Sequence, residues 1–245
     1  MKQKISILLV LLTYSLCLSA QKLIEAVDAK DYTTVEECLK NGDKVNKTNK
    51  KNSFPLWIAV WNNDSRMVDL LLKNGADPNQ KFKGKDAQIA CLEIAAQEGF
   101  LEIAQLLVSA NADINVKGVE GFTPLRIAAG NGRLELVKYF ASKGAEIDTK
   151  GNDGATPLEH AAGKGHLEIV QFLAENGANI NHQDKDGDSP LGEAARHGHI
   201  DVVNYLLSKG ANTTLKNKDG STAEELAKFA GQPKVEAAIK AYKQP

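Results

Sequence analysis

The stretch GATPLEHAAGKGHLEIVQFLAENGANIN, residues 154–181, decides the fold of this chain because it recurs. The segments GFTPLRIAAGNGRLELVKYFASKGAEID at 121–148 and GDSPLGEAARHGHIDVVNYLLSKGANTT at 187–214 match it position by position. Leu125, Leu158 and Leu191 occupy the same place in the three copies, at a spacing of 33 residues. A fixed period of this length indicates an architecture built from one repeated structural unit.

Looser copies extend the repeat in both directions along the chain. Leu92, Leu56 and Leu23 mark earlier units, and a last unit opens at Gly220. The outer copies match least well, as expected of terminal units that must present one face to water. We therefore expect seven units, with boundaries at about 21–48, 49–84, 85–117, 118–150, 151–183, 184–216 and 217–245.

Each recurring residue has a physical role in one unit. Thr156 can accept a hydrogen bond from a backbone N–H at a helix start, and Pro157 suits the first helical turn. Gly165 ends this helix so that a second can return, and Gly177 follows the second helix in a left-handed conformation. Asn111 replaces that last glycine in an earlier copy, as asparagine commonly does. The pattern predicts two short antiparallel helices and a polar, hairpin-like finger loop per unit.

The 33-residue period and the threonine–proline–leucine start at residues 156–158 resemble those of ankyrin repeats. This resemblance covers essentially all of residues 21–245, which we expect to form one ankyrin-repeat domain. It implies an all-α fold: a helical solenoid of about seven repeats in which the first and last act as caps. It also implies that a protein partner is bound by the concave row of first helices and by the finger loops.

The composition is that of an ordinary water-soluble globular protein. Of the 245 residues, 42% are hydrophobic and 25% are charged, and the formal net charge is −1. This charge lacks the basic excess of a general nucleic-acid or anionic-membrane binder, so we expect no nucleic-acid partner. Cys38 and Cys91 have no metal-ligand spacing and lie two units apart, which predicts two buried, unpaired thiols. No metal ion or cofactor is expected.

Residues 1–20 differ in character from the rest of the chain. Lys2 and Lys4 precede an apolar run at 5–12, and Ala20 is a small residue that suits cleavage before Gln21. This pattern is typical of a signal peptide. The alternative is a retained membrane anchor or a buried N-terminal helix, but the apolar run is short for a membrane-spanning helix. We therefore expect an exported protein, periplasmic or secreted, without stable membrane insertion once the signal is removed.

Two departures from the repeat are candidates for function. Trp57 and Trp61 are four residues apart in unit two and so share one helix face, with Trp57 expected to be half covered. They predict either a binding hot spot or a seal against the incomplete first unit. The interval from Leu56 to Leu92 is 36 residues instead of 33, and the extra residues fall in the finger QKFKGKDAQ at 80–88. This lysine-rich finger carries Phe82 and either contacts an acidic partner or is a tolerated insertion.

A third departure is the pair His160 and Glu193, which occupy equivalent sites where other copies have isoleucine. We expect His160 to donate a hydrogen bond to Glu193, whose carboxylate would raise the pKa of the imidazole. The rival interpretation is a hydrolase site built on these two residues. Glu159 and His166 stand at framework or surface positions, and no nucleophile accompanies them in a catalytic triad. The chain is therefore not expected to be an enzyme.

The favoured function is a non-enzymatic protein-interaction module that acts outside the cytoplasm, as a monomer. One alternative is an inhibitor, immunity protein or protective partner of an exported enzyme or toxin, and another is a structural spacer. The residues expected to contact a partner come from first helices and fingers: Trp57, Trp61, Asn62, Phe82, Gln97, Glu98, Phe122, Asn131, Asn152, Asp153, Lys164, Lys185, Asp186, Asp188, Arg196 and His197. Both charge signs occur among them, which favours one folded protein as the partner.

Overall fold

The structure is a computed structural model that describes residues 21–84 and 88–242. The signal peptide expected at residues 1–20 lies outside the described residues. Residues 85–87 of the finger insertion and residues 243–245 do so too. The chain folds into two compact units, which divide between Asp113 and Ile114. From here on, the first unit and the second unit are these two parts of the chain, and each contains several of the 33-residue repeats.

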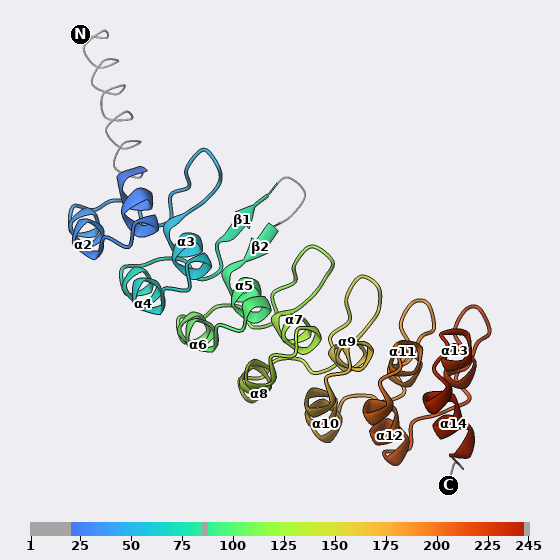
Figure 1. The fold of residues 1–245 in the computed structure, drawn as a ribbon. Helices are drawn as coiled ribbons and strands as arrows, with labels where there is room; N and C mark the ends of the chain where they lie inside the picture. Colours follow the sequence, from blue (N-terminus) through green and yellow to red (C-terminus); the bar gives the residue numbers. More distant parts are fainter. Residues whose placement is uncertain (1–20, 85–87, 243–245) are drawn as a thin grey trace, which may run out of the picture. The chain divides into compact units, whose positions relative to one another are not determined.

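The first unit contains helices and one β-hairpin. Residues 21–28 are helical, and the elements that follow are α2 (Tyr32–Lys40), α3 (Pro55–Trp61), α4 (Ser65–Lys73), β1 (Lys81–Lys83), β2 (Gln88–Ala90), α5 (Cys91–Glu98) and α6 (Leu101–Ser109). α3 packs against α4 and α5 against α6, and the two pairs also pack on each other. Figure 1 shows that the hairpin rises from the N-terminal end of α5.

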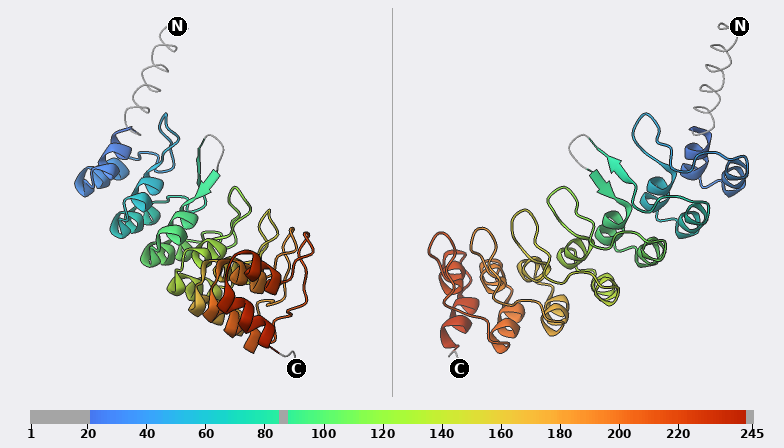
Figure 2. Two further views of the ribbon diagram at one scale, coloured as in Figure 1. Left: turned by 45° about the vertical axis from the view of Figure 1, so that its right-hand side comes forward. Right: turned by 180° about the vertical axis from the view of Figure 1, so that it is seen from behind.

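The second unit repeats one helix pair four times. Its elements are α7 (Pro124–Gly130), α8 (Leu134–Ser142), α9 (Pro157–Lys164), α10 (Leu167–Glu175), α11 (Pro190–His197), α12 (Ile200–Ser208), α13 (Ala223–Phe229) and α14 (Pro233–Ala241). The first helices of the pairs pack side by side in one row, and the second helices form a second row behind them. Both views in Figure 2 show these two rows. The prediction of stacked helix pairs in a solenoid is confirmed.

The residues that recur in the sequence begin and end these helices as predicted. The Thr156 hydroxyl accepts a hydrogen bond from the Glu159 backbone N–H at 3.3 Å, and Pro157 is the first residue of α9. Gly165 ends α9 with a φ of 75°, and Gly177 has a φ of 90° after α10. Asn111 adopts the same left-handed conformation with a φ of 68°. These positions favour residues without a strained Cβ, so the units turn at fixed places.

The core lies between the two rows and between neighbouring pairs. Leu125, Leu158 and Leu191 are buried, as predicted for the residues that mark the repeat. Ala161 and Ala194 are fully buried on α9 and α11, where their small side chains allow the helices to approach closely. No single pair could bury this surface alone, which is why stacking stabilises the fold.

Histidines at the start of second helices connect neighbouring pairs. His166 Nε2 donates to the carbonyl oxygen of Gly130 at 3.1 Å, and His199 Nε2 donates to that of Gly163 at 3.0 Å. Each bond satisfies a carbonyl group near the end of the preceding first helix. Of the two alternatives expected for His166, a framework or a surface position, this contact shows the framework one.

The finger loops are joined by single backbone hydrogen bonds in the second unit. The N–H of Lys185 donates to the carbonyl of Asp153 at 2.9 Å, and the N–H of Lys218 donates to that of Asp186 at 2.8 Å. The inserted finger differs from a loop, because β1 and β2 pair antiparallel with Phe82 opposite Ile89. The finger that is three residues longer is thus the one that carries a short β-ladder.

Cys38 and Cys91 are both buried and neither forms a disulfide, as predicted. Burial raises the pKa of the Cys91 thiol, so this group stays protonated and unreactive at neutral pH. Within the described part of the chain, the helices lack the combination of length and apolarity that crossing a membrane requires.

Candidate functional site

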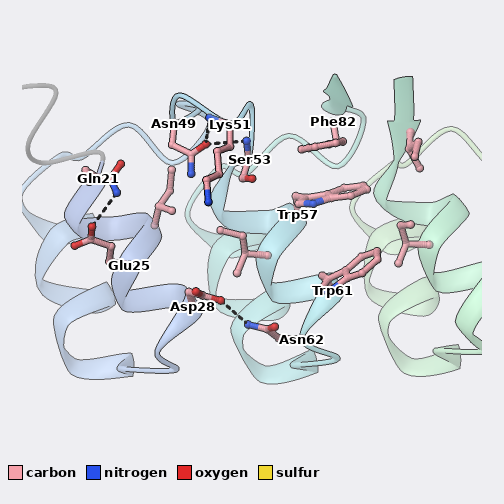
Figure 3. Close-up of a pocket in the computed structure, with 14 residues that line it drawn as sticks. Gln21, Glu25, Asp28, Asn49, Lys51, Ser53, Trp57, Trp61, Asn62 and Phe82 are labelled. Carbon is pink, nitrogen blue, oxygen red and sulfur yellow. Dashed lines mark hydrogen bonds between the residues drawn. The ribbon is translucent and has the colours of Figure 1, made fainter. Parts of the chain in front are cut away.

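Three aromatic rings define a groove in the first unit. Trp57 and Trp61 lie on one face of α3, with ring centroids 6.1 Å apart. Phe82 on β1 stacks on the other side of Trp57, with centroids 4.6 Å apart and an interplanar angle of 12°. Figure 3 shows the three rings following one another from the finger toward the end of α3. Trp57 is therefore held between Trp61 and Phe82.

The two tryptophans differ in what they present to solvent. Trp57 is 9% exposed, whereas Trp61 is 63% exposed. The expectation that Trp57 is half covered is wrong, because the stacked Phe82 ring and the tilted ring of Phe54 cover it. Trp57 is thus covered by its own repeat and by the finger that follows it, whereas Trp61 remains accessible. The two interpretations of this pair, a binding hot spot and a seal against the first repeat, both stay predictions.

The groove has an apolar floor and a polar rim, and its volume is about 580 Å³. The floor includes isoleucines from the helical residues 21–28, α3, β2 and α5: Ile24, Ile58, Ile89 and Ile94. Along the rim, the Asn62 side-chain amide donates to Asp28 at 3.4 Å, next to Trp61 (Figure 3). Glu25 and Lys51 add one charge of each sign. A mostly apolar hollow with few polar groups suits a side chain or a short segment of another protein.

The finger of the insertion does not extend Phe82 toward a partner. Its ring is packed on Trp57 and its backbone is paired with Ile89, so Phe82 shapes the wall of the groove. Lys83, next to it on β1, is exposed. The aromatic residue of the finger thus belongs to the base of the site, and the exposed lysine belongs to its edge.

A second hollow, of about 420 Å³, lies in the second unit and is polar. At one end of it Arg126, which is only 2% exposed, makes a bidentate ion pair with Asp153. Arg126 Nε also donates to His160 Nδ1 at 3.0 Å, and the guanidinium lies 3.8 Å from the centroid of the Phe122 ring. A buried arginine needs such partners because an unpaired charge would be costly here.

These contacts set the charges of the neighbouring groups. Burial acts to raise the pKa of Asp153, but hydrogen bonds from Arg126 and from the Ala155 N–H outweigh it and hold the pKa below its usual range. Burial, reinforced by the charge of Arg126, lowers the pKa of His160 to about 4. The imidazole of His160 is therefore neutral at pH 7 and accepts from the arginine.

The predicted pairing of His160 with Glu193 is wrong. His160 accepts from Arg126 instead of donating to Glu193, so its pKa falls where we expected it to rise. Glu193 forms an ion pair with Arg196 at 3.0 Å and approaches His197 at 3.7 Å. The acid–base pair on which the hydrolase interpretation depended is not formed.

Glu159 lies at a buried framework position, which is one of the two alternatives expected for it. Its side chain is 3% exposed, and its Oε2 atom is buried without a hydrogen-bond partner. Burial, together with the nearby carboxylates of Asp184 and Glu193, raises the pKa of Glu159 to about 9. The group is therefore a neutral carboxylic acid at pH 7.

The residues predicted to contact a partner separate into two clusters and a remainder. Four of them line the groove of the first unit: Trp57, Trp61, Asn62 and Phe82. Six others line the polar hollow of the second unit: Asp153, Lys164, Asp186, Asp188, Arg196 and His197. The lining of neither hollow includes Gln97, Glu98, Phe122, Asn131, Asn152 or Lys185.

Two of these residues are less accessible than a contact role requires. Asp188 is buried, and its carboxylate accepts from Arg196 at 2.7 Å and from the Asn217 side chain at 3.1 Å. Trp57 is buried beneath its neighbours. Both support neighbouring side chains from below the surface.

Sequence reasoning missed Phe229 and undervalued Arg126. Phe229, the last residue of α13, is 76% exposed and stands in the same repeat position as the exposed Trp61. That shared register was a signal that could have identified it. Arg126 gave no such signal, because its partners Asp153 and His160 lie 27 and 34 residues away in sequence.

Within residues 21–84 and 88–242, no group of three or more His, Cys, Asp or Glu side chains is arranged to hold a metal ion. The polar hollow contains six carboxyl groups, but those of Asp153 and Asp188 are already engaged by arginines. The side chains that line the two hollows offer apolar contacts, hydrogen bonds and charges.

Comparison with known families agrees with this architecture. The family model for ankyrin repeats (3 copies) matches residues 23–118, 92–184, 125–217 and 177–237. Together these matches cover nearly all of the described chain.

Individual relatives match less than half of this chain. Alpha-latrocrustotoxin-Lt1a of Latrodectus tredecimguttatus is 33% identical over 105 residues, which is 42% of this chain and 7% of that protein. An ankyrin repeat protein of Fowlpox virus (strain NVSL) is 31% identical over 102 residues, 41% of this chain and 17% of the viral protein. The ankyrin repeat, SAM and basic leucine zipper domain-containing protein 1 of Pongo abelii is 35% identical over 106 residues, 43% of this chain and 22% of that protein. The matched stretches thus span less than a quarter of each relative.

Proposed function

Because this chain belongs to the ankyrin-repeat family, whose repeats form protein–protein interaction modules, we propose that it is a non-enzymatic module that binds one folded protein. The observation that carries the proposal is Trp61, a 63% exposed indole at the mouth of the groove in the first unit. An exposed tryptophan beside an apolar hollow is the residue type that most often dominates binding energy in protein interfaces.

The setting of Trp61 favours binding over a structural role. The ring stacks on Trp57, which Phe82 holds from the other side, so the conformational freedom of Trp61 is already restricted in the free chain. A preorganised aromatic loses little conformational entropy on binding, which increases the affinity that it can supply. Because most of its surface faces solvent, its removal should cost the fold little.

Affinity capture with variants of Trp61 tests this proposal. Immobilised chain is exposed to the native extracytoplasmic fraction, and the captured protein is identified and its affinity measured. We expect Trp61→Ala to weaken binding by about 30-fold, which corresponds to roughly 2 kcal/mol for a hot-spot residue. Trp61→Phe should retain most of the affinity because the ring still fills the groove.

The matched control is Tyr139→Ala on α8, which removes a half-exposed aromatic from the row of second helices. It should leave binding unchanged. Thermal unfolding of Trp61→Ala should stay close to that of the parent chain. Equal binding by the parent and by Trp61→Ala would refute the proposal, and so would a loss of binding that merely follows a loss of folded protein.

We also propose that the module acts outside the cytoplasm, supported by the signal-peptide pattern of residues 1–20. N-terminal sequencing of the native protein tests this: Gln21 as the first residue supports export, and retention of Met1 contradicts it. The narrower hypothesis, that the partner is an exported enzyme or toxin, rests on the same pattern and is decided by the identity of the captured protein.

A further inference from the structure

Two neighbouring junctions in the second unit use the same three positions for different chemistry. In the junction between α7 and α9, Arg126 is held by Asp153 of the next finger and by His160 of the next first helix. The His160 ring lies against Gly130, where a Cβ would be 3.0 Å from it. This junction is complete, because its buried guanidinium has both an acid and an acceptor.

One repeat later, Glu159 takes the place of Arg126, Asp186 that of Asp153, and Glu193 that of His160. The backbone arrangement is retained. Glu193 lies against Gly163 as His160 lies against Gly130, since a Cβ on Gly163 would be 3.1 Å from the Glu193 carboxylate. The second junction therefore has the acidic side of the arrangement and a third acid where the guanidinium would be.

The side chains already present do not complete this junction. Arg196 bonds to Asp188 at 2.7 Å and to Glu193 at 3.0 Å, and Lys218 lies 3.5 Å from Asp186 on the exposed side. Neither reaches Glu159, whose buried Oε2 atom has no hydrogen-bond partner. The carboxylate of Asp184 accepts only from backbone N–H groups of its own finger, at 2.8 and 2.9 Å.

The hollow in front of Glu159 has the charge and size for a cationic group. Its lining of six carboxyl groups and three lysine or arginine side chains gives an excess of acid, and its volume is about 420 Å³. A single arginine side chain is much smaller than this volume, so it can enter without displacing the fingers. Planar guanidinium pairs with carboxylates in a bidentate manner, as Arg126 and Asp153 do one repeat earlier.

We propose that the polar hollow lined by Glu159, Asp184 and Glu193 binds a guanidinium group, supplied by an arginine side chain of the partner protein. The incoming cation plays the part that Arg126 plays in the preceding junction, and Glu159 ionises to pair with it. Asp184 supplies the second carboxylate, because Asp186, the equivalent of Asp153, already lies 3.5 Å from Lys218. This assignment rests on the proposed function only for the source of the arginine. The binding site itself is a property of this chain and is tested without any partner.

A metal ion is a poorer match for the same hollow. Within the described residues no cluster of acids is arranged for metal coordination. The acids here are spread over three elements: Glu159 lies on α9, Asp184 in the finger and Glu193 on α11. A flat, extended cation with several donors fits such spread acceptors better than a single point charge does.

The test uses N-acetyl-arginine amide as the probe and N-acetyl-citrulline amide as its neutral isostere, titrated into the full chain and followed by NMR. We expect saturable shifts at Glu159, Asp184 and Glu193 with the arginine probe, with a dissociation constant on the order of millimolar. The citrulline probe, which has the same shape without the charge, should give no saturable shift. Calcium chloride is titrated in parallel.

Variants localise the response. Glu159→Gln keeps the shape of the side chain but cannot ionise, so arginine affinity should fall by about tenfold. Glu168→Gln, an exposed acid on α10, is the matched control and should bind like the parent. Glu159→Arg places a guanidinium in the junction from within and should abolish the response to the probe.

Several results would overturn the assignment. These are equal shifts with the arginine and citrulline probes, an unchanged affinity in Glu159→Gln, saturable binding of calcium at the same residues, or no saturable response at all. Each is independent of Trp61, so failure here leaves the proposed protein-binding groove of the first unit standing. Conversely, a loss of partner capture in Trp61→Ala concerns only the groove of the first unit and is no support for guanidinium binding in this hollow.

Discussion

Replacing Glu159 by glutamine should change how the stability of the fold depends on pH. The ordinary pKa of a glutamate is 4.5, and in the folded chain burial beside Asp184 and Glu193 raises that of Glu159 to about 9. Between these values the folded state holds a proton that the unfolded state has lost. Stability therefore falls as the pH rises through this window, because ionisation favours the unfolded chain.

The size of the effect follows from the same two values. Each rise of one pH unit lowers the free energy of unfolding by about 1.4 kcal/mol while the folded group stays protonated. From pH 7.0 to pH 8.5 the loss in the parent chain is roughly 2 kcal/mol. This interval avoids His160, whose lowered pKa of about 4 affects stability only in the acidic range. Glutamine carries no titrating proton, so Glu159→Gln removes this loss.

Urea unfolding followed by circular dichroism at pH 7.0 and pH 8.5 measures the change. The parent chain and Glu168→Gln, whose mutated side chain is exposed on α10, should lose the same stability between the two pH values. Glu159→Gln should lose much less. If its unfolding midpoint drops as far as that of the parent chain, Glu159 is not a buried neutral acid and the reasoning is refuted.

Two further predictions concern the framework of the second unit. Arg126→Met removes a 2% exposed guanidinium and should lower the free energy of unfolding by about 2 kcal/mol, less than for a fully buried pair because its aspartate partner is half exposed. The pKa of His160 should rise in the same variant, since the nearby charge is gone; an unchanged pKa by NMR would contradict the assigned contact. Gly165→Ala and Gly177→Ala both place a Cβ in the left-handed region, at a cost of about 1 kcal/mol each. Only the new Cβ at position 165 would clash with a side chain, because it would lie 2.5 Å from the His199 ring. Gly165→Ala should therefore unfold at a lower urea concentration than Gly177→Ala. Equal unfolding midpoints of the two variants would show that the contact with His199 adds nothing to stability.

The helix pairs could be predicted from the sequence because their signals are local. Thr156, Pro157 and Gly165 each act on the backbone within a few residues, and the same signals return in every strong copy. Burial of the marker leucines followed from the repeat period alone. The order of elements and their ends therefore needed no knowledge of long-range contacts.

The side chains of the candidate sites were predicted less well, because their environments depend on other units. His160 was expected to face Glu193 in the following repeat, but it accepts a hydrogen bond from Arg126 in the preceding repeat. The burial of Trp57 depends on Phe82, which reaches it only because the inserted finger forms a β-ladder. Periodicity shows that two positions are equivalent, but it does not show which neighbour a side chain contacts.

One repeat position explains why the two hollows differ although the backbone is repeated. It lies in the first turn of the first helix and is buried where it is Trp57, Glu93, Arg126, Glu159 or Gly192, whereas Glu225 at the same position of α13 is exposed. An indole there gives the aromatic groove, an arginine gives a closed ion pair, and a glutamate facing further acids gives the polar hollow. Glu93 instead accepts from the Ala90 N–H at 2.7 Å and completes a helix cap. In the second unit, where the helix pairs repeat one pattern, the residue at this position therefore changes the chemistry of a junction. In the first unit the inserted finger contributes as well, because it brings Phe82 onto Trp57.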